Sequence, residues 1–203
     1  MELTQEFPTG PILDYQQNAR PESIAGDILM CSGSGAFSRM IQLGTKSDWS
    51  HIASIHWVEF GVGSEPRLMV MESVEGHGVR MVPLSSYLSD YASSGKPYPG
   101  GLAIARHVDM TPEAAAAGTK WAIPRLGYEY DKGEIVTIAW RVMSGISGDV
   151  DTDNQFICSE FKGRMLKAGG LEVYWNKQGF LAPSDYANDP KIELLGVLQA
   201  KPD

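Results

Sequence analysis

Cysteine and histidine are the most reactive side chains of this sequence, and one of each stands where a secondary-structure element is predicted to begin. Cys158 opens a predicted amphipathic helix, whose first N–H groups and dipole stabilise a negative charge such as a thiolate. His51 opens a predicted strand, and Glu72 lies in the next one, from which its carboxylate can orient the imidazole if the two strands pair. A thiol, an imidazole and a carboxylate together support nucleophilic catalysis through an acyl-enzyme.

Each of these residues also has an interpretation that involves no chemistry. A cysteine that follows Phe156 and Ile157 is typical of a small buried apolar side chain. His51 fits a hydrogen-bonded residue at a strand edge, and Glu72 fits a solvated one. Sequence spacing alone leaves both interpretations open. The second cysteine, Cys31, ends a predicted strand and has no base assigned to it, so we expect it to be a neutral, slowly reacting thiol.

The sequence predicts neither a metal nor an organic cofactor. Two cysteines are too few for a thiolate zinc cage, and the four histidines include no H-x-x-x-H pair. His51 and His56 are five residues apart, so they would face opposite sides of a strand.

Residues 149–160 form the strongest competing metal motif, because acidic side chains occupy positions one, three, five and twelve of a calcium loop (Asp149, Asp151, Asp153 and Glu160). Asn154 replaces the glycine of that loop, and Ile157 stands where a polar ligand is usual. Asparagine tolerates the left-handed conformation, so the apolar Ile157 is the stronger objection. We predict a solvated acidic turn that binds no calcium.

Composition indicates a globular protein with a substantial core, because 43% of the 203 residues are hydrophobic, which fits one domain better than two. The formal net charge of -8 provides no basic stripe for a phosphate backbone, so nucleic acid is not an expected partner. No apolar run reaches the roughly 20 residues that span a bilayer, and the first ten residues lack the features of a secretory signal. We expect a chain without a transmembrane anchor that is cytoplasmic as synthesised.

Apolar periodicity predicts an α+β domain over residues 24–203, preceded by a surface arm over residues 1–23. Strands are expected to form an antiparallel sheet from residues 26–31, 51–60, 67–74, 78–84 and 101–107. Helices are expected over 35–47 with Gly44 as C-terminal cap, around 84–91, and over 158–167. A further helix is expected to begin at Thr111 as N-cap and to be ended or kinked by Pro124.

A series of short motifs resembles a known family when taken in order. The motifs are "GDIL", "FSRMIQLGTKSDWSHIAS", "MES", "GVRMVPLSSYLSDY", "YEYDKG", "FICSEF" and "LAPSDY", which run from about Gly26 to Tyr186. Their order is similar to that of the circularly permuted NlpC-type papain-like cysteine hydrolases of the YiiX-like group, in which histidine and acid precede the cysteine. The resemblance implies a permuted papain-like fold with a central antiparallel sheet or barrel flanked by helices.

The resemblance also implies roles for single residues. Cys158 would be the nucleophile, His51 the general base and acid, and Glu72 the residue that orients the imidazole. Tyr130 of "YEYD" would line the site, and the neighbours of the base and the nucleophile, Ser50 and Ser159, complete the expected substrate-binding set.

The implied activity is that of a thiol protease or amidase that cleaves amide bonds in peptidoglycan peptides or a related small peptide. The protein would be bacterial or from a phage, and a phage, lysis or dedicated secretion route would carry it to the wall. The sequence identifies no immunity or delivery partner.

Two other functions fit the same residues. The permuted fold also resembles lecithin:retinol-acyltransferase-like enzymes, which act on lipid acyl esters, and the tryptophans Trp49, Trp57 and Trp140 could then line an acyl groove. The third alternative is a non-catalytic papain-like module of a phage particle or a toxin.

Overall fold

The computed structural model of the protein describes residues 5–129, 157–174 and 181–202, and its centre is a six-stranded antiparallel sheet. The strand order is β4-β3-β2-β1-β5-β6. The strands are β1 Ile28–Gly33, β2 His51–Val58, β3 Arg67–Val74, β4 Gly78–Pro83, β5 Gly100–His107 and β6 Ile192–Gln199. The predicted class, α+β with an antiparallel sheet flanked by helices, is confirmed.

The helices are short; two precede β1, and the others lie between successive strands along the chain. They are η1 Tyr15–Ala19, α1 Arg20–Glu22, α2 Ala36–Thr45, α3 Leu84–Ser89, η2 Tyr91–Ser93, α4 Pro112–Ala122, η3 Ile123–Arg125, α6 Cys158–Ala168 and α7 Pro183–Asn188. In the described ranges, no helix combines the length and the apolar character needed to cross a membrane.

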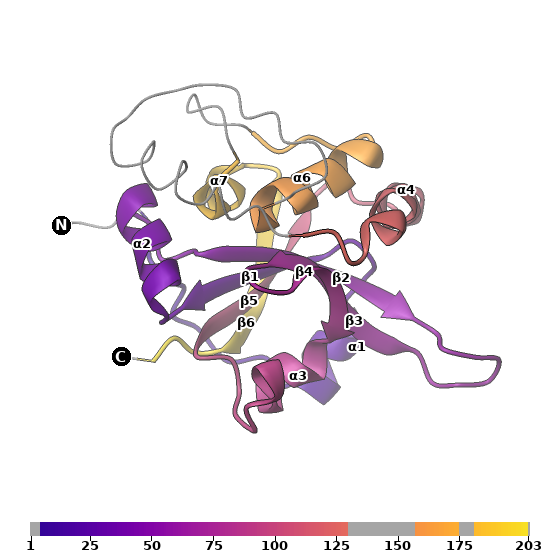
Figure 1. Ribbon diagram of the computed structural model, residues 1–203, viewed down its shortest axis with the longest axis horizontal. Helices are drawn as coiled ribbons and strands as arrows, with labels where there is room; N and C mark the ends of the chain where they lie inside the picture. Colours follow the sequence, from indigo (N-terminus) through magenta and orange to yellow (C-terminus); the bar gives the residue numbers. More distant parts are fainter. Residues whose placement is uncertain (1–4, 130–156, 175–180, 203) are drawn as a thin grey trace.

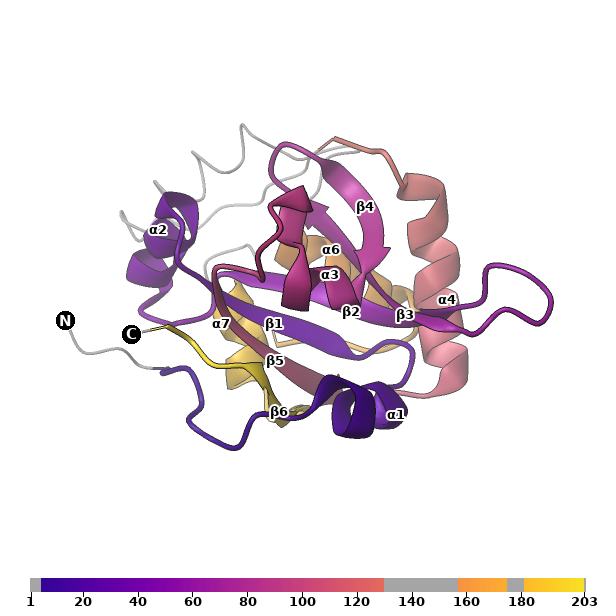
Figure 2. The ribbon, with the colours of Figure 1, turned by 90° about the horizontal axis from the view of Figure 1, so that it is seen from below.

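The sheet has a core on each face. Helices α4, α6 and α7 cover one face, and α3 lies against the other (Figure 1). Ala19 of η1 is buried in the same core as α3. Figure 2, seen from below, shows α3 and α1 in front of the strands. Successive residues of β1 alternate between the two cores, since Ile28 and Met30 belong to the first and Leu29 and Cys31 to the second. This alternation is the period of two that an extended strand imposes.

Local sequence signals explain the ends of the helices that pack on the first face. Thr111 caps α4, because its hydroxyl accepts the N–H of Ala114 at 3.2 Å, and Pro112 occupies the first helical position. The helix ends at Ala122, before Pro124, as predicted.

The predicted cap of α2 is wrong. The helix continues past Gly44 to Thr45, and Lys46 takes the left-handed conformation with φ of 53°. Tertiary contacts fix this exit, because the Ser47 hydroxyl donates to the Gln5 side chain at 2.8 Å. A contact with the N-terminal segment therefore overrides the local preference for glycine at the cap.

Two regions contribute more to the fold than the sequence predicted. Strand β6 was not predicted, because the apolar residues of its sequence do not alternate regularly with polar ones. Its pairing with β5 is correspondingly irregular, with two shifts of register. The arm over residues 1–23 is partly packed, because Phe7 and Ala19 are buried in the two cores and the Leu13 N–H donates to the Val197 carbonyl at 2.7 Å.

Candidate active site

His51 and Glu72 are brought together by the pairing of neighbouring strands. His51 is the first residue of β2, and β3 runs antiparallel beside it with Ser54 opposite Met71. When this register is continued along the two strands, Glu72 lies diagonally across from His51. Its side chain is therefore on the same face of the sheet as the imidazole. The His51 Nε2 and a Glu72 carboxylate oxygen are 2.7 Å apart.

Cys158 reaches the same imidazole from the opposite layer. It is the first residue of α6, follows the extended N-cap Ile157, and is almost completely buried. Its side chain hydrogen-bonds the His51 ring, and its sulfur accepts the backbone N–H groups of Ile52 and Ser159. Because Glu72 engages Nε2, the thiol meets the other ring nitrogen, Nδ1. The structure therefore brings the three residues together as a chain, whereas their catalytic roles stay predictions.

The charges of the three residues favour a thiolate beside an imidazolium. Burial alone would lower the pKa of His51, but the negative charges of Cys158 and Glu72 and their hydrogen bonds raise it to about 10. Burial alone would raise the pKa of Cys158, but the His51 charge and the hydrogen bonds to the sulfur lower it. Near neutral pH, the shared proton therefore resides on His51.

Glu72 is completely buried, and two residues that sequence reasoning missed hold its charge. The Arg80 guanidinium binds one carboxylate oxygen at 2.9 Å, and the Tyr87 hydroxyl donates to the oxygen that faces His51. Burial raises the pKa of Glu72, yet the hydrogen bonds and charges of His51, Arg80 and Tyr87 lower it overall. Arg80 could have been found, because the Val74–Gly78 hairpin register places it opposite Glu72.

Tyr87→Phe is expected to lower the free energy of unfolding by about 1–3 kcal/mol, since it removes a buried hydrogen bond to a charged carboxylate. Urea unfolding monitored by circular dichroism measures the change. Tyr128→Phe, at an exposed position, is the matched control and should change stability by less than about 0.5 kcal/mol. Equal effects of the two substitutions would contradict the proposed role of the Tyr87 hydroxyl.

A groove of about 260 Å³ opens onto Cys158 and His51. Its described walls are the start of α2 at residues 35–38, the end of β3 at 73–75, and the residues Ser50, Tyr91 and Tyr98. The lining therefore combines serine and tyrosine side chains and the acidic Glu75 with the apolar Phe37 and Val74. Ligand pockets are commonly about 300–1,000 Å³, so this groove is small and of mixed polarity.

The predicted substrate-binding residues have different positions. The buried Ser50 lines the groove, and its hydroxyl accepts the Gly33 N–H at 2.9 Å. Ser159 does not line the described groove, contrary to expectation, because its hydroxyl donates into the interior to the Leu181 carbonyl. Its contribution to the site is the backbone N–H that contacts the thiolate. Tyr130 lies outside the described residues.

Two of the three tryptophans assigned to an acyl groove in the lipid alternative have other contacts in the structure. Trp49 is buried against Phe7, with ring centroids 5.1 Å apart. Trp57 donates its indole N–H to the Ser23 carbonyl at 2.9 Å. Trp140 lies outside the described residues.

Metal ligands do not gather in the part of the chain that the structure describes. There, no group of three or more His, Cys, Asp and Glu side chains is arranged to hold an ion. Residues 149–156 of the acidic turn lie outside the described ranges, whereas Glu160 is buried in the first turn of α6.

Comparison with known proteins shows a likeness of fold to a solved structure. No protein-family model matches the sequence, and no curated protein matches it. The crystal structure of the metalloprotein YiiX from Escherichia coli O157:H7, designated DUF1105, is similar with a TM-score of 0.60 and 18% sequence identity. The match covers 89% of this chain and 99% of that chain. At this identity the likeness establishes a YiiX-like fold.

Proposed function

We propose that this protein is a cysteine hydrolase of the permuted papain-like type that cleaves an amide bond in a small peptide, with peptidoglycan peptides as the leading substrate. The observation that carries the proposal is the chain from the Cys158 thiol through the His51 imidazole to the buried, charge-stabilised Glu72 carboxylate. A carboxylate buried in this way has a high desolvation cost. A buried carboxylate that is paired with a histidine is typical of a catalytic site, where it orients the imidazole.

The reaction starts with the proton already on His51. The Cys158 thiolate attacks the carbonyl carbon of the amide and forms a carbon–sulfur bond, while the carbonyl oxygen becomes negative. Backbone N–H groups at the start of α6, which lack intrahelical acceptors, are suited to hold that oxyanion. His51 then gives its Nδ1 proton to the leaving nitrogen as the carbon–nitrogen bond breaks, which leaves an acyl-enzyme.

Water completes the cycle. Neutral His51 takes a proton from the water as its oxygen attacks the thioester carbon. Collapse of the second tetrahedral species expels the Cys158 thiolate and releases the acid, and the proton remains on His51. Glu72 keeps the same ring orientation in both halves of the reaction because Arg80 and Tyr87 hold its carboxylate.

The groove favours a small polar substrate over a lipid chain. Its walls carry hydroxyl groups of serine and tyrosine beside a few apolar side chains, a lining suited to a peptide. The lipid alternative loses the support of Trp49, which is part of the core.

The test is product analysis. Wild-type protein is incubated with purified peptidoglycan fragments and, separately, with a panel of lipid acyl esters, and the products are identified by mass spectrometry. We expect a new free amine and a new carboxylic acid from the peptides, with no fatty acid released or transferred, and no product from a Cys158→Ala blank. Fatty acid release would favour the lipid alternative, and an inert protein with a reactive Cys158 would favour a binding module.

A further inference from the structure

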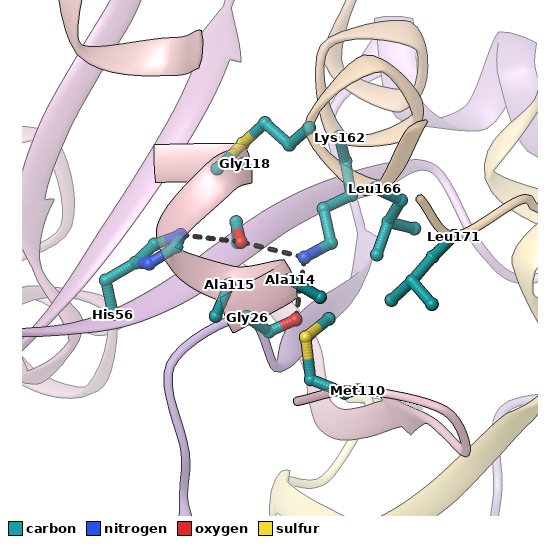
Figure 3. A pocket seen from close by; sticks show the side chains of 11 residues that line it. Gly26, His56, Met110, Ala114, Ala115, Gly118, Lys162, Leu166 and Leu171 are labelled. Atoms are coloured by element: carbon teal, nitrogen blue, oxygen red, sulfur yellow. Dashed lines mark hydrogen bonds between the residues drawn. The ribbon is translucent and has the colours of Figure 1, made fainter. Parts of the chain in front are cut away.

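A second buried polar cluster lies one helical turn beyond Cys158. Lys162 of α6 is only 1% exposed, and its Nζ donates to the Gly26 carbonyl at 2.7 Å and to the Ser54 hydroxyl at 2.8 Å. In Figure 3, dashed lines join this Nζ to the Gly26 carbonyl oxygen and, through the Ser54 hydroxyl, to the His56 ring. Burial of a lysine ammonium group lowers stability unless hydrogen bonds and nearby charges compensate the loss of water. A lysine at this position therefore suggests a specific role.

The hydrogen bonds of the cluster form one chain in which each group has a defined role as donor or acceptor. Lys162 only donates, so the Ser54 hydroxyl accepts from it and donates onward to His56 Nε2 at 2.8 Å. The Thr119 hydroxyl donates to the Ala115 carbonyl at 2.8 Å, and it therefore accepts from His56 Nδ1 at 3.1 Å. His56 is thus neutral with its proton on Nδ1, which agrees with the lowering of its pKa to about 3 by burial and by the Lys162 charge. The cluster links α6, β2 and α4.

The space around the cluster is too small for a substrate. The cavity measures about 10 Å³, which is room for about one water molecule. The backbones also approach closely here, because a Cβ on Gly118 of α4 would lie 2.8 Å from the Met165 carbonyl oxygen of α6. The cluster is therefore a point of attachment between elements and not a second catalytic pocket.

The same two elements carry this attachment and the candidate active site. On α6, Cys158 and Lys162 are four residues, about 6 Å, apart. On β2, His51 and Ser54 are three residues, about 10 Å, apart. A hydrogen bond between Lys162 and Ser54 therefore restricts both the rotation and the sliding of α6 over β2, and those movements set the contact between thiol and imidazole.

We propose that Lys162 is a positioning residue, which holds α6 on β2 so that the Cys158 thiolate meets the His51 imidazolium. This inference rests on the proposed role of Cys158 in the site. Lys162 itself is not among the residues that line the described groove.

The test uses Lys162→Met, because an apolar side chain of similar volume at a buried cationic position is often tolerated by the fold. The readout is the rate of Cys158 alkylation by iodoacetamide as a function of pH, followed by peptide mapping. We expect a rate about 5- to 10-fold lower at pH 6.5 and a profile midpoint that moves up by about one pH unit, toward an ordinary thiol. Lys167→Met, at an exposed position of the same helix, is the control and should match wild type.

Ser54→Ala removes the acceptor on the strand side and should move the profile in the same direction, which provides the test if Lys162→Met fails to fold. An unchanged profile in the folded variants would overturn the proposal, even if their stability changed, since stability alone does not move the thiol midpoint. Alkylation requires no turnover. A shifted profile in a protein without hydrolytic activity would therefore overturn the proposed function and leave the positioning role intact.

The stability of the same variants gives a second measurement. Burial lowers the pKa of Lys162 to about 7, partly offset by the Asp27 charge, whereas the unfolded chain has an ordinary lysine near 10.5. Between these values the unfolded state binds more protons, so stability should rise with pH. Asp27, which is paired with Arg106, and His56 are the other titratable groups near Lys162. The pKa of His56 is lowered to about 3, so His56 stays neutral in this window. The urea midpoint of wild type should therefore rise relative to Lys162→Met between pH 7 and pH 10, and Lys167→Met should retain the rise. Parallel midpoints for wild type and Lys162→Met would show that the lysine is not titrated in this environment.

Discussion

Limiting iodoacetamide at pH 6.5 is expected to alkylate Cys158 at least about 100-fold faster than Cys31. An ordinary thiol with a pKa near 8.5 is only about 1% thiolate at this pH, and the thiolate is the form that reacts. The pKa of Cys31 is raised further by burial and by the negative charges of Glu72 and Cys158. Cys158 instead pairs with the His51 imidazolium and lines the groove, so its thiolate is both populated and reachable.

The pH dependence of the alkylation rate distinguishes a thiolate that is paired with an imidazolium from a thiol that is merely accessible. Because the pKa of His51 is raised to about 10, the ion pair should persist through the neutral range, and labelling should fall only as pH drops through the lowered pKa of Cys158. His51→Ala should reduce labelling of Cys158 at least about 10-fold at pH 6.5 and should restore most of it near pH 9.5. Peptide mapping that found Cys31 modified first would move the nucleophile elsewhere.

The arrangement of the strands was largely predictable because its signals are local. Strand β3 falls at the predicted residues 67–74, and His51 is the first residue of β2 as expected, since alternation and flanking turns define both. Predicting that Glu72 reaches the imidazole required only the pairing of adjacent strands. The contact with Cys158 could not be derived in this way, because more than a hundred residues separate it from His51, and only the resemblance to a family supplied it.

The parts of the site that escaped prediction depend on long-range packing. The hydroxyl of Ser159 lies beside the nucleophile in sequence, yet it points to Leu181 because a helix turns each successive side chain by about 100°. Tyr87 reaches Glu72 only after α3 has packed on the sheet. The sequence around Lys162 predicts the polar side of an amphipathic helix. The Lys162 side chain is nevertheless buried, because α6 packs against β2 and α4.

Glu72→Gln is expected to lower the rate of peptide hydrolysis by about 1,000-fold, because the substitution changes the tautomer of His51. The shape of the groove should not change. Arg80 donates to one carboxylate oxygen, and it will hold the carbonyl oxygen of the glutamine there. The amide NH₂ then occupies the position that faces His51, now as a donor. The imidazole must accept at Nε2 and carry its proton on Nδ1, which leaves it unable to take a proton from the thiol.

The labelling profile checks this explanation independently of turnover. In Glu72→Gln the neutral His51 no longer deprotonates Cys158, so alkylation at pH 6.5 should fall about 10-fold or more, and the midpoint should rise toward that of an ordinary thiol. Glu65→Gln, an exposed carboxylate in the loop before β3, removes the same charge without contact to His51 and should leave both readouts at the wild-type level. If Glu72→Gln retained wild-type labelling and turnover, the carboxylate would have no part in setting the proton on His51, and its burial beside Arg80 and Tyr87 would serve stability alone.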